Sequence, residues 1–230
     1  MTKSTKKSTK KSTEKKPAKK PVIKKPVIKK LKPCTIPISS IIRHTSITPV
    51  RKKGLIHFSD YPEFTPNLTP RHMFVLGSFG GTYWRPIKST ITHQSYNNVH
   101  KQYPNSWWKD IPENRLSRPW NQYDKTINQY GVKVGTTLRF WESKCWISPN
   151  HPYGWVQWYC DFYEGKRCAD DARQIKRWKG LAGPKGRFRN MLLNMLRRKK
   201  RPYDDVTISP KIRQTLQHWA YKIRKQDLTS

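Results

Sequence analysis

Acidic side chains are scarce in this sequence of 230 residues. It contains 14 Asp and Glu against 48 Lys and Arg, which leaves a formal net charge of +34. Such a charge disfavours a compact chain until a partner neutralises it. Nucleic acid is the usual partner, because each Lys or Arg contact with a phosphate releases condensed counterions. An anionic membrane surface is the second candidate, and a solubilising or ribosome-associated charge is the third.

Long apolar runs and an apolar N-terminal leader are also absent. No segment approaches the length of a membrane span, so we expect no transmembrane segment. The first residues are rich in Lys and lack the apolar stretch of a signal peptide. We therefore expect an intracellular protein, in the nucleus or the cytoplasm.

Motifs for metals and nucleotide cofactors are missing as well. The four cysteines are Cys34, Cys145, Cys160 and Cys168. No pair has the CxxC spacing of a zinc site, and His151 does not complete one. The paired glycines at positions 80 and 81 are not followed by the Gly-Lys-Ser/Thr of a phosphate-binding loop. We expect no metal and no cofactor.

Only a few side chains suggest an enzyme. The acid–base candidates are Asp60 with Glu63, Asp161 with Glu164, and His151. Asp60, Glu63 and His151 could converge beside the glycines at 80 and 81, as a nuclease or a base-processing enzyme requires. Surface carboxylates paired with the surplus Arg and Lys are the favoured interpretation. The sequence identifies no catalytic residue, and a non-enzymatic function is favoured.

Charge and composition divide the chain into four parts. Residues 1–33 hold 14 Lys and one acidic residue, for a charge of +13, and their repeated Pro predicts a disordered basic arm. We expect a linker or extended joint over 34–54, a basic, Trp-rich helical domain over 55–225 and a C-terminal tail over 226–230. The 197 residues after the arm carry 34 basic and 13 acidic residues, so the domain is basic in its own right, at +21.

Helix signals predict a mainly α fold, with a single compact multi-helix domain and minor strand content. Thr69 and Pro70 combine an N-cap residue with Pro at the first helical position. Residues 88–125 are polar and predict loops with short helical turns. Further helix starts are predicted at Thr136-Thr137, Pro152, Asp170-Asp171, Gly186 and Ser209-Pro210.

Basic side chains concentrate between residues 166 and 201. The turn from Gly183 to Gly186 precedes a helix, where backbone N–H groups favour a phosphate. A solvated basic face with structural glycines is the competing interpretation. The predicted nucleic-acid-binding residues are Arg85, Arg167, Arg173, Lys176, Arg177, Lys179, Lys185, Arg187, Arg189, Arg197, Arg198, Lys199, Lys200 and Arg201.

The segment GSFGGTYWRP at 77–86 has two interpretations. Its glycines let the backbone approach a ligand, with Tyr83 or Trp84 stacking on a base and Arg85 on a phosphate. Alternatively it is a structural turn that buries Trp84, and this second interpretation is favoured.

Several stretches together resemble a known family. They are FSDYPEFTPNLTPRHMFVLGSFGGTYWRPI at 58–87, GVKVGTTLRFWESKCWI at 131–147, the block from Gly154 to Phe188, and ISPKIRQTLQHWAYKI at 208–223. They resemble an uncharacterised, mimivirus-like family of large DNA viruses with relatives in cellular organisms. The resemblance covers most of 55–225 and implies one compact domain without an established activity. The arm resembles linker-histone tails in composition only.

These observations predict a non-enzymatic nucleic-acid-binding protein that contacts mostly the phosphate backbone, with DNA favoured over RNA. The viral resemblance adds a role in genome packaging or in the virion. A nucleic-acid-processing enzyme is one alternative. A protein-interaction module of a virion or of chromatin is another, and contiguous exposed aromatic residues would favour it. The sequence does not indicate an oligomeric state.

Overall fold

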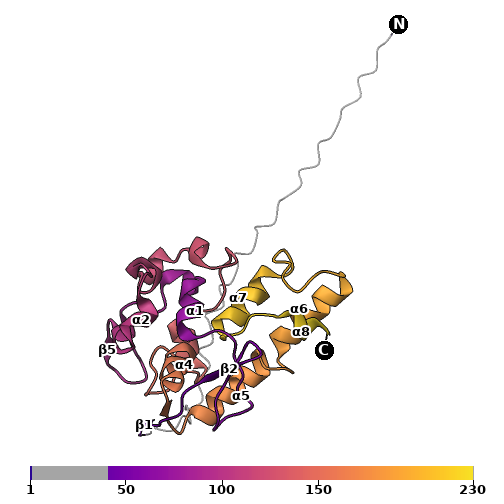
Figure 1. Ribbon diagram of the computed structural model, residues 1–230. Helices are drawn as coiled ribbons and strands as arrows, with labels where there is room; N and C mark the ends of the chain where they lie inside the picture. Colours follow the sequence, from indigo (N-terminus) through magenta and orange to yellow (C-terminus); the bar gives the residue numbers. More distant parts are fainter. Residues whose placement is uncertain (2–40, 230) are drawn as a thin grey trace. The chain divides into compact units, whose positions relative to one another are not determined.

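The computed structural model describes Met1 and residues 41–229 (Figure 1). Two units divide the chain, Met1–Lys32 and Pro33–Ser230, and every element below belongs to the second unit. Residues 2–33 of the predicted arm, residues 34–40 of the predicted joint, and Ser230 lie outside the described residues. The described part is mainly α-helical with minor strand content, as the sequence predicts.

Eight α-helices occur in the described part. They are α1 Pro70–Val75, α2 Asn105–Trp108, α3 Leu138–Ser143, α4 Trp155–Tyr163, α5 Asp171–Leu181, α6 Arg187–Arg198, α7 Pro210–His218 and α8 Lys225–Thr229. Short 3₁₀ turns are η1 Phe79–Gly81, η2 Val99–Gln102, η3 Glu113–Arg115, η4 Trp120–Gln122 and η5 Lys125–Ile127. The connections over 88–125 are therefore loops with short turns, as expected.

The strands are short and form antiparallel pairs. They are β1 Arg43–His44, β2 Val50–Lys52, β3 Leu55–His57, β4 Ile87–Lys88, β5 Ser95–Tyr96 and β6 Lys166–Arg167. β1 pairs with β6, β2 with β3 and β4 with β5. Because β1 pairs with β6, which follows α4, the later part of the predicted joint packs on the domain.

Local capping explains where two helices begin. The Thr69 side chain accepts a hydrogen bond from the backbone N–H of His72, and the Thr137 side chain accepts one from Phe140. Both starts are confirmed. α4 begins later than predicted, at Trp155, because the chain turns through Gly154 at φ 85°.

Aromatic side chains on α4 form the centre of the core. Eight of its nine residues are buried. Phe64 makes edge-to-face contacts with Tyr159, Phe162 and Trp178 of α4 and α5, with ring centroids 5.0 to 5.8 Å apart. α4 packs against α1 and α5, and most of the aromatic rings of the domain belong to the core.

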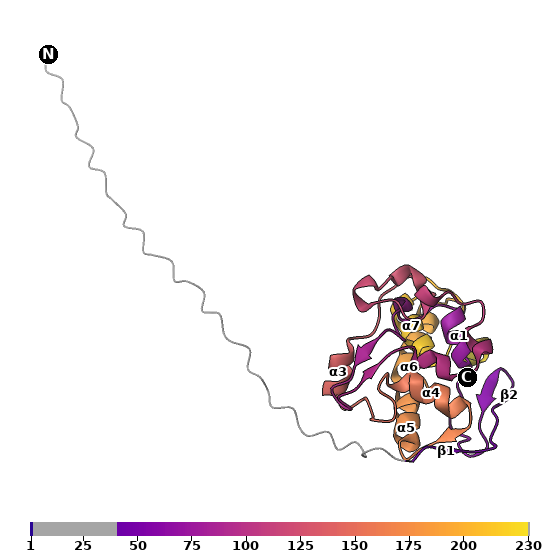
Figure 2. The same ribbon diagram turned by 90° about the vertical axis from the view of Figure 1, so that its left-hand side faces the viewer.

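The α5–α6 pair lies away from the η2–α2 region. α6 packs against α5, α7 and α8. In Figure 1, α2 and β5 lie on the left, and α6 and α8 lie on the right. Figure 2 shows α5 below α6, with α3 to their left in that view. The basic residues between 166 and 201, most of which are predicted nucleic-acid contacts, thus lie mostly on one side of the domain.

The C-terminal residues expected to form a tail instead form α8. Asp227 of this helix is buried and accepts hydrogen bonds from the side chains of Arg189, Arg224 and Tyr221. The hydrogen bond between this buried carboxylate and the guanidinium group of Arg189 holds α8 against α6.

Candidate nucleic-acid interface

Four of the predicted contact residues bind carboxylates of the domain itself. Arg167 Nε donates to Asp60 at 2.6 Å, and its guanidinium carbon lies 3.7 Å from the ring centroid of Phe162. Arg173 donates hydrogen bonds to the Asp170 carboxylate from two nitrogen atoms, Nε and Nη2. The four pairs are Arg167–Asp60, Arg173–Asp170, Arg189–Asp227 and Arg201–Asp205. Arg167, Arg173 and Arg189 are at most 29% exposed and hold parts of the fold together, whereas Arg201 is 54% exposed.

Three other predicted arginines are packed against the domain. Arg85 donates to the carbonyl of Thr82 and lies over the ring of Trp120. Arg197 donates to the carbonyl of Leu228, which closes the end of α8. Burial lowers the pKa of Arg177 to about 10, so this guanidinium still carries its charge at pH 7.

The remaining seven predicted residues are exposed and have no ion pair with any carboxylate that the structure describes. We call them the α5–α6 basic face. They are Lys176, Lys179, Lys185, Arg187, Arg198, Lys199 and Lys200. Residues 172–203 contain twelve Lys or Arg and no acidic residue. Arg173, Arg189 and Arg201 pair with carboxylates outside this stretch, whereas the α5–α6 basic face has no such pair among the described residues.

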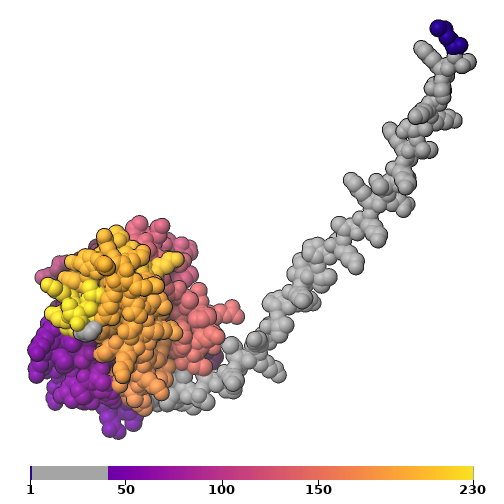
Figure 3. Space-filling view, turned by 90° about the vertical axis from the view of Figure 1, so that its right-hand side faces the viewer, coloured from indigo at the N-terminus to yellow at the C-terminus, as the bar shows by residue number. Residues whose placement is uncertain are grey.

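The periodicity of α6 places two of these cations on one stripe. Arg187, Met191, Asn194 and Arg198 are exposed at spacings of four, three and four residues. Leu192, Leu193 and Leu196 are buried on the other side. A rise of 1.5 Å per residue separates the two arginines by about 17 Å along one face. Figure 3 shows this orange segment across the middle of one side of the domain.

The turn before α6 is tightly packed. A Cβ on Gly186 would lie 2.5 Å from the carbonyl carbon of Leu181, and one on Gly183 would lie 2.8 Å from the Cα of Lys179. Packing therefore explains both glycines. The same turn brings the start of α6, with Arg187, next to the end of α5.

The loop over 77–86 is a structural turn, the interpretation that the sequence favours. Trp84 and Tyr83 are buried and cannot stack on a base in this conformation. A Cβ on Gly77 would lie 1.8 Å from the carbonyl oxygen of Ile127. Gln217 of α7 donates to the Gly77 carbonyl at 2.7 Å. The loop nevertheless contributes two rings, those of Phe79 and Tyr83, to the wall of a cavity.

The three residues of the predicted enzymatic alternative do not form one centre. Asp60 binds Arg167, Glu63 is exposed, and His151 is buried against Asp161. Among the described residues, no three His, Cys, Asp or Glu side chains lie close enough together to hold a metal ion.

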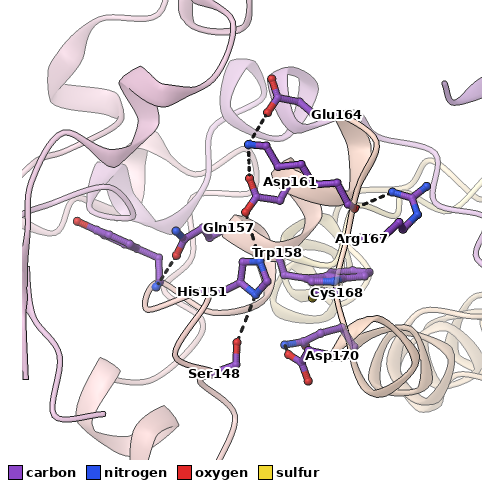
Figure 4. Close-up of polar contacts among 12 residues, drawn as sticks. Ser148, His151, Gln157, Trp158, Asp161, Glu164, Arg167, Cys168 and Asp170 are labelled. Atoms are coloured by element: carbon purple, nitrogen blue, oxygen red, sulfur yellow. Dashed lines mark hydrogen bonds and ion pairs between the residues drawn. The ribbon is translucent and has the colours of Figure 1, made fainter. Parts of the chain in front are cut away.

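His151 and Asp161 lie in one chain with Ser148, an arrangement that the sequence does not predict (Figure 4). Ser148 Oγ lies 3.3 Å from His151 Nδ1, and His151 Nε2 lies 3.3 Å from Asp161 Oδ2. The sequence identifies His151 and Asp161 as candidates, but no pattern indicates that they meet or that Ser148 joins them. Ser148 is 3% exposed and His151 1%, so no substrate reaches the hydroxyl in this conformation.

Lys166 completes this buried polar chain. Its ammonium lies 2.9 Å from Asp161 and 3.0 Å from Glu164. Burial acts to raise the pKa of Asp161, but hydrogen bonds from His151 and Lys166 outweigh it, and the pKa is lowered. The chain ties the loop before α4 to β6, which is a structural role.

Exposed apolar rings are few. Phe140 and Trp146 contact each other edge to face at 5.7 Å, beside α3. No helix in the described part is both long and apolar enough to cross a membrane. Comparison with protein-family models, curated proteins and solved structures finds no match for this chain.

Proposed function

We propose that the protein is a non-enzymatic nucleic-acid-binding protein whose domain contacts phosphates through the α5–α6 basic face. The observation that carries the proposal is the set of seven exposed cations without carboxylate partners. Residues 172–203 hold no acidic side chain, so these seven cations form a basic stretch in and beside α5 and α6. Contacts of this kind bind without strong sequence preference.

The N-terminal residues supply a second cationic element. Residues 1–33 add a charge of +13 to the +21 of the remaining chain. Deleting residues 1–33 should weaken binding without abolishing it, because the domain has its own phosphate contacts. The resemblance to a family of large DNA viruses favours DNA over RNA, in the host nucleus or cytoplasm, with a role in genome packaging or in the virion.

The proposal is tested by the salt dependence of DNA binding. The variant Lys176→Gln, Lys179→Gln, Lys185→Gln removes three charges from the α5–α6 basic face. The matched control is Lys88→Gln, Lys101→Gln, Lys109→Gln, which removes three exposed charges from the β4, η2 and α2 region. Fluorescence anisotropy with a labelled duplex, between about 50 and 200 mM salt, gives the slope of log affinity against log salt.

We expect the first variant to make the slope shallower by about 2 to 3, since each phosphate contact contributes roughly 0.9. The control should keep the slope of the unaltered protein. A flat slope in the unaltered protein would contradict phosphate binding altogether. Equal losses in the two variants would show that the charge acts without a preferred face.

A further inference from the structure

A cavity of about 280 Å³ lies where α3, α5, α6 and α7 meet the loop over 77–81. Aromatic rings form much of its wall, among them those of Phe79, Trp141, Trp146, Trp155, Phe188 and Trp219. Ligand pockets usually measure about 300–1,000 Å³. A cavity near the lower end of that range suits one flat ring system.

His218 offers the cavity a hydrogen-bond donor. The backbone N–H of Phe79 donates to His218 Nε2 at 3.1 Å, so this nitrogen carries no proton. Burial lowers the pKa of His218 to about 3, and the ring is neutral at pH 7. The remaining proton is therefore on Nδ1.

No acceptor among the described residues receives this Nδ1–H. Gln214 Nε2 lies 3.1 Å from the other ring nitrogen, Nε2. His218 is 6% exposed and lines the cavity. Its Nδ1 atom is not among the fully buried polar atoms that lack a hydrogen-bond partner in the described residues. An apolar pocket with one polar donor is typical of sites that orient a ring bearing acceptor atoms.

Two arginines add positive charge to the same cavity. The guanidinium carbon of Arg177 lies 5.3 Å from the ring centroids of both Trp146 and Trp219. Arg187, of the α5–α6 basic face, lies 4.8 Å over the ring of Phe188. Aromatic pockets also bind cations, but the two guanidinium groups at this cavity repel a cationic ligand electrostatically. A flat ring attached to an anion fits both features.

Exposed rings at the cavity extend this surface. Trp146 lines the cavity, is 39% exposed and contacts Phe140, which is equally exposed. Proteins that bind single strands combine a basic surface with aromatic rings on which bases stack. The cavity and the α5–α6 basic face share Arg187, so a strand on that face passes the cavity.

We infer that the cavity receives one unstacked nucleobase of a single strand, with the adjoining phosphates on Arg177 and Arg187. This inference rests on the proposed function and specifies its substrate. Acceptor atoms on the base edge would receive the His218 Nδ1–H. A base within a duplex would first have to unpair and unstack, which costs a few kcal/mol. The domain should therefore prefer single strands.

The experiment compares Trp146→Ala with Trp120→Ala in the full chain. Trp120 is a close control because it is 38% exposed and lies under Arg85, but it does not line this cavity. Binding of each variant to a labelled single-stranded oligonucleotide and to the duplex of the same length is measured by anisotropy. A partly unfolded variant would lose affinity for both, so the ratio of the two affinities is the readout.

We expect Trp146→Ala to weaken single-strand binding about tenfold, since stacking on one aromatic ring contributes on this scale. Duplex binding should be unchanged, and Trp120→Ala should match the unaltered protein on both ligands. A 2-aminopurine base in the single strand should be quenched by the unaltered protein and less by Trp146→Ala.

Three outcomes would overturn the inference. Equal losses on single strand and duplex would mean that Trp146 stacks on no unpaired base. An unchanged affinity would remove the cavity from binding. A mononucleotide that binds as tightly as the oligonucleotide would make this a site for free nucleotides. In all three, salt-dependent duplex binding leaves the proposed function standing, whereas failure to bind either ligand would reject the proposed function itself.

Discussion

The rings of Phe79 and His218 stack face to face, with centroids 3.8 Å apart and 14° between their planes. The backbone N–H of Phe79 donates to His218 Nε2 at 3.1 Å. Phe79 has a φ of 54°, a conformation that L-residues rarely adopt. The contact from α7 therefore holds a strained residue in place, and strain of this kind collects at functional sites.

This contact predicts a pH dependence of stability. The pKa of His218 falls to about 3 in the folded state, below its ordinary 6.5. The unfolded chain then binds more protons than the folded one between those values, so stability falls as the pH drops through that window. From pH 7 to pH 5 we expect a loss of about 2 kcal/mol from this group.

His218→Gln isolates the effect, because a Gln carbonyl can accept from Phe79 but does not titrate. The free energy of unfolding in urea, measured at pH 7, 6 and 5, should fall more steeply for the unaltered protein than for the variant. The remaining histidines are common to both proteins. Parallel curves would mean that the His218 ring is not kept neutral by burial.

The close approach at Gly77 makes a second prediction. Gly77 and Gly135 have φ values of 93° and 91°, but only Gly77 has a neighbour, the Ile127 carbonyl, in the space that a Cβ would occupy. Gly135→Ala should cost about 1–2 kcal/mol for the left-handed backbone. Gly77→Ala should cost at least about 2 kcal/mol more, since packed backbone must move. Urea denaturation of both variants measures the difference, and similar costs would contradict the packing at this turn.

The sequence predicts the features of this fold that depend on neighbours along the chain. Thr69 and Pro70 begin a helix because an N-cap needs only the next three residues. The concentration of basic residues between 166 and 201 depends only on composition along the chain. Both could be found by pattern alone.

Contacts between residues far apart in the chain could not be predicted from the sequence, for a physical reason. Arg167 meets Asp60 across 107 residues of chain, and Arg189 meets Asp227 across 38. Which arginines bind carboxylates and which face solvent depends on packing that no local pattern encodes. The cavity likewise needs Phe79 and His218, which are 139 residues apart.

The carboxylate of Asp227 carries a third prediction. It is buried and binds both Arg189 and Arg224, each at 2.9 Å. Asp227→Asn leaves two partly buried guanidinium groups without their counter-charge, and we expect a loss of about 3 kcal/mol. Asp110→Asn is the control, because Asp110 is well exposed and 3.9 Å from Arg71, and it should cost under about 1 kcal/mol. Thermal unfolding of both variants tests this, and equal effects would show that α8 is not fastened through Asp227.

Arg173 and Lys176 lie one turn apart on α5 and should respond in opposite ways. Arg173 donates to Asp170 at 2.8 Å and to the Cys145 carbonyl at 3.2 Å, whereas Lys176 is exposed without an ion pair to any described carboxylate. Arg173→Gln strips the buried Asp170 of its cation, so stability should fall by about 3 kcal/mol. The salt slope of duplex binding should not change, because this guanidinium faces the protein.

Lys176→Gln should leave the free energy of unfolding within about 0.5 kcal/mol of the unaltered protein. It should reduce the salt slope of duplex binding by about 1, the effect of one lost phosphate contact. Urea denaturation and anisotropy on the same two preparations give both quantities. If Arg173→Gln changed the slope and Lys176→Gln did not, the phosphates would lie against the paired arginines, and the α5–α6 basic face would not be the interface.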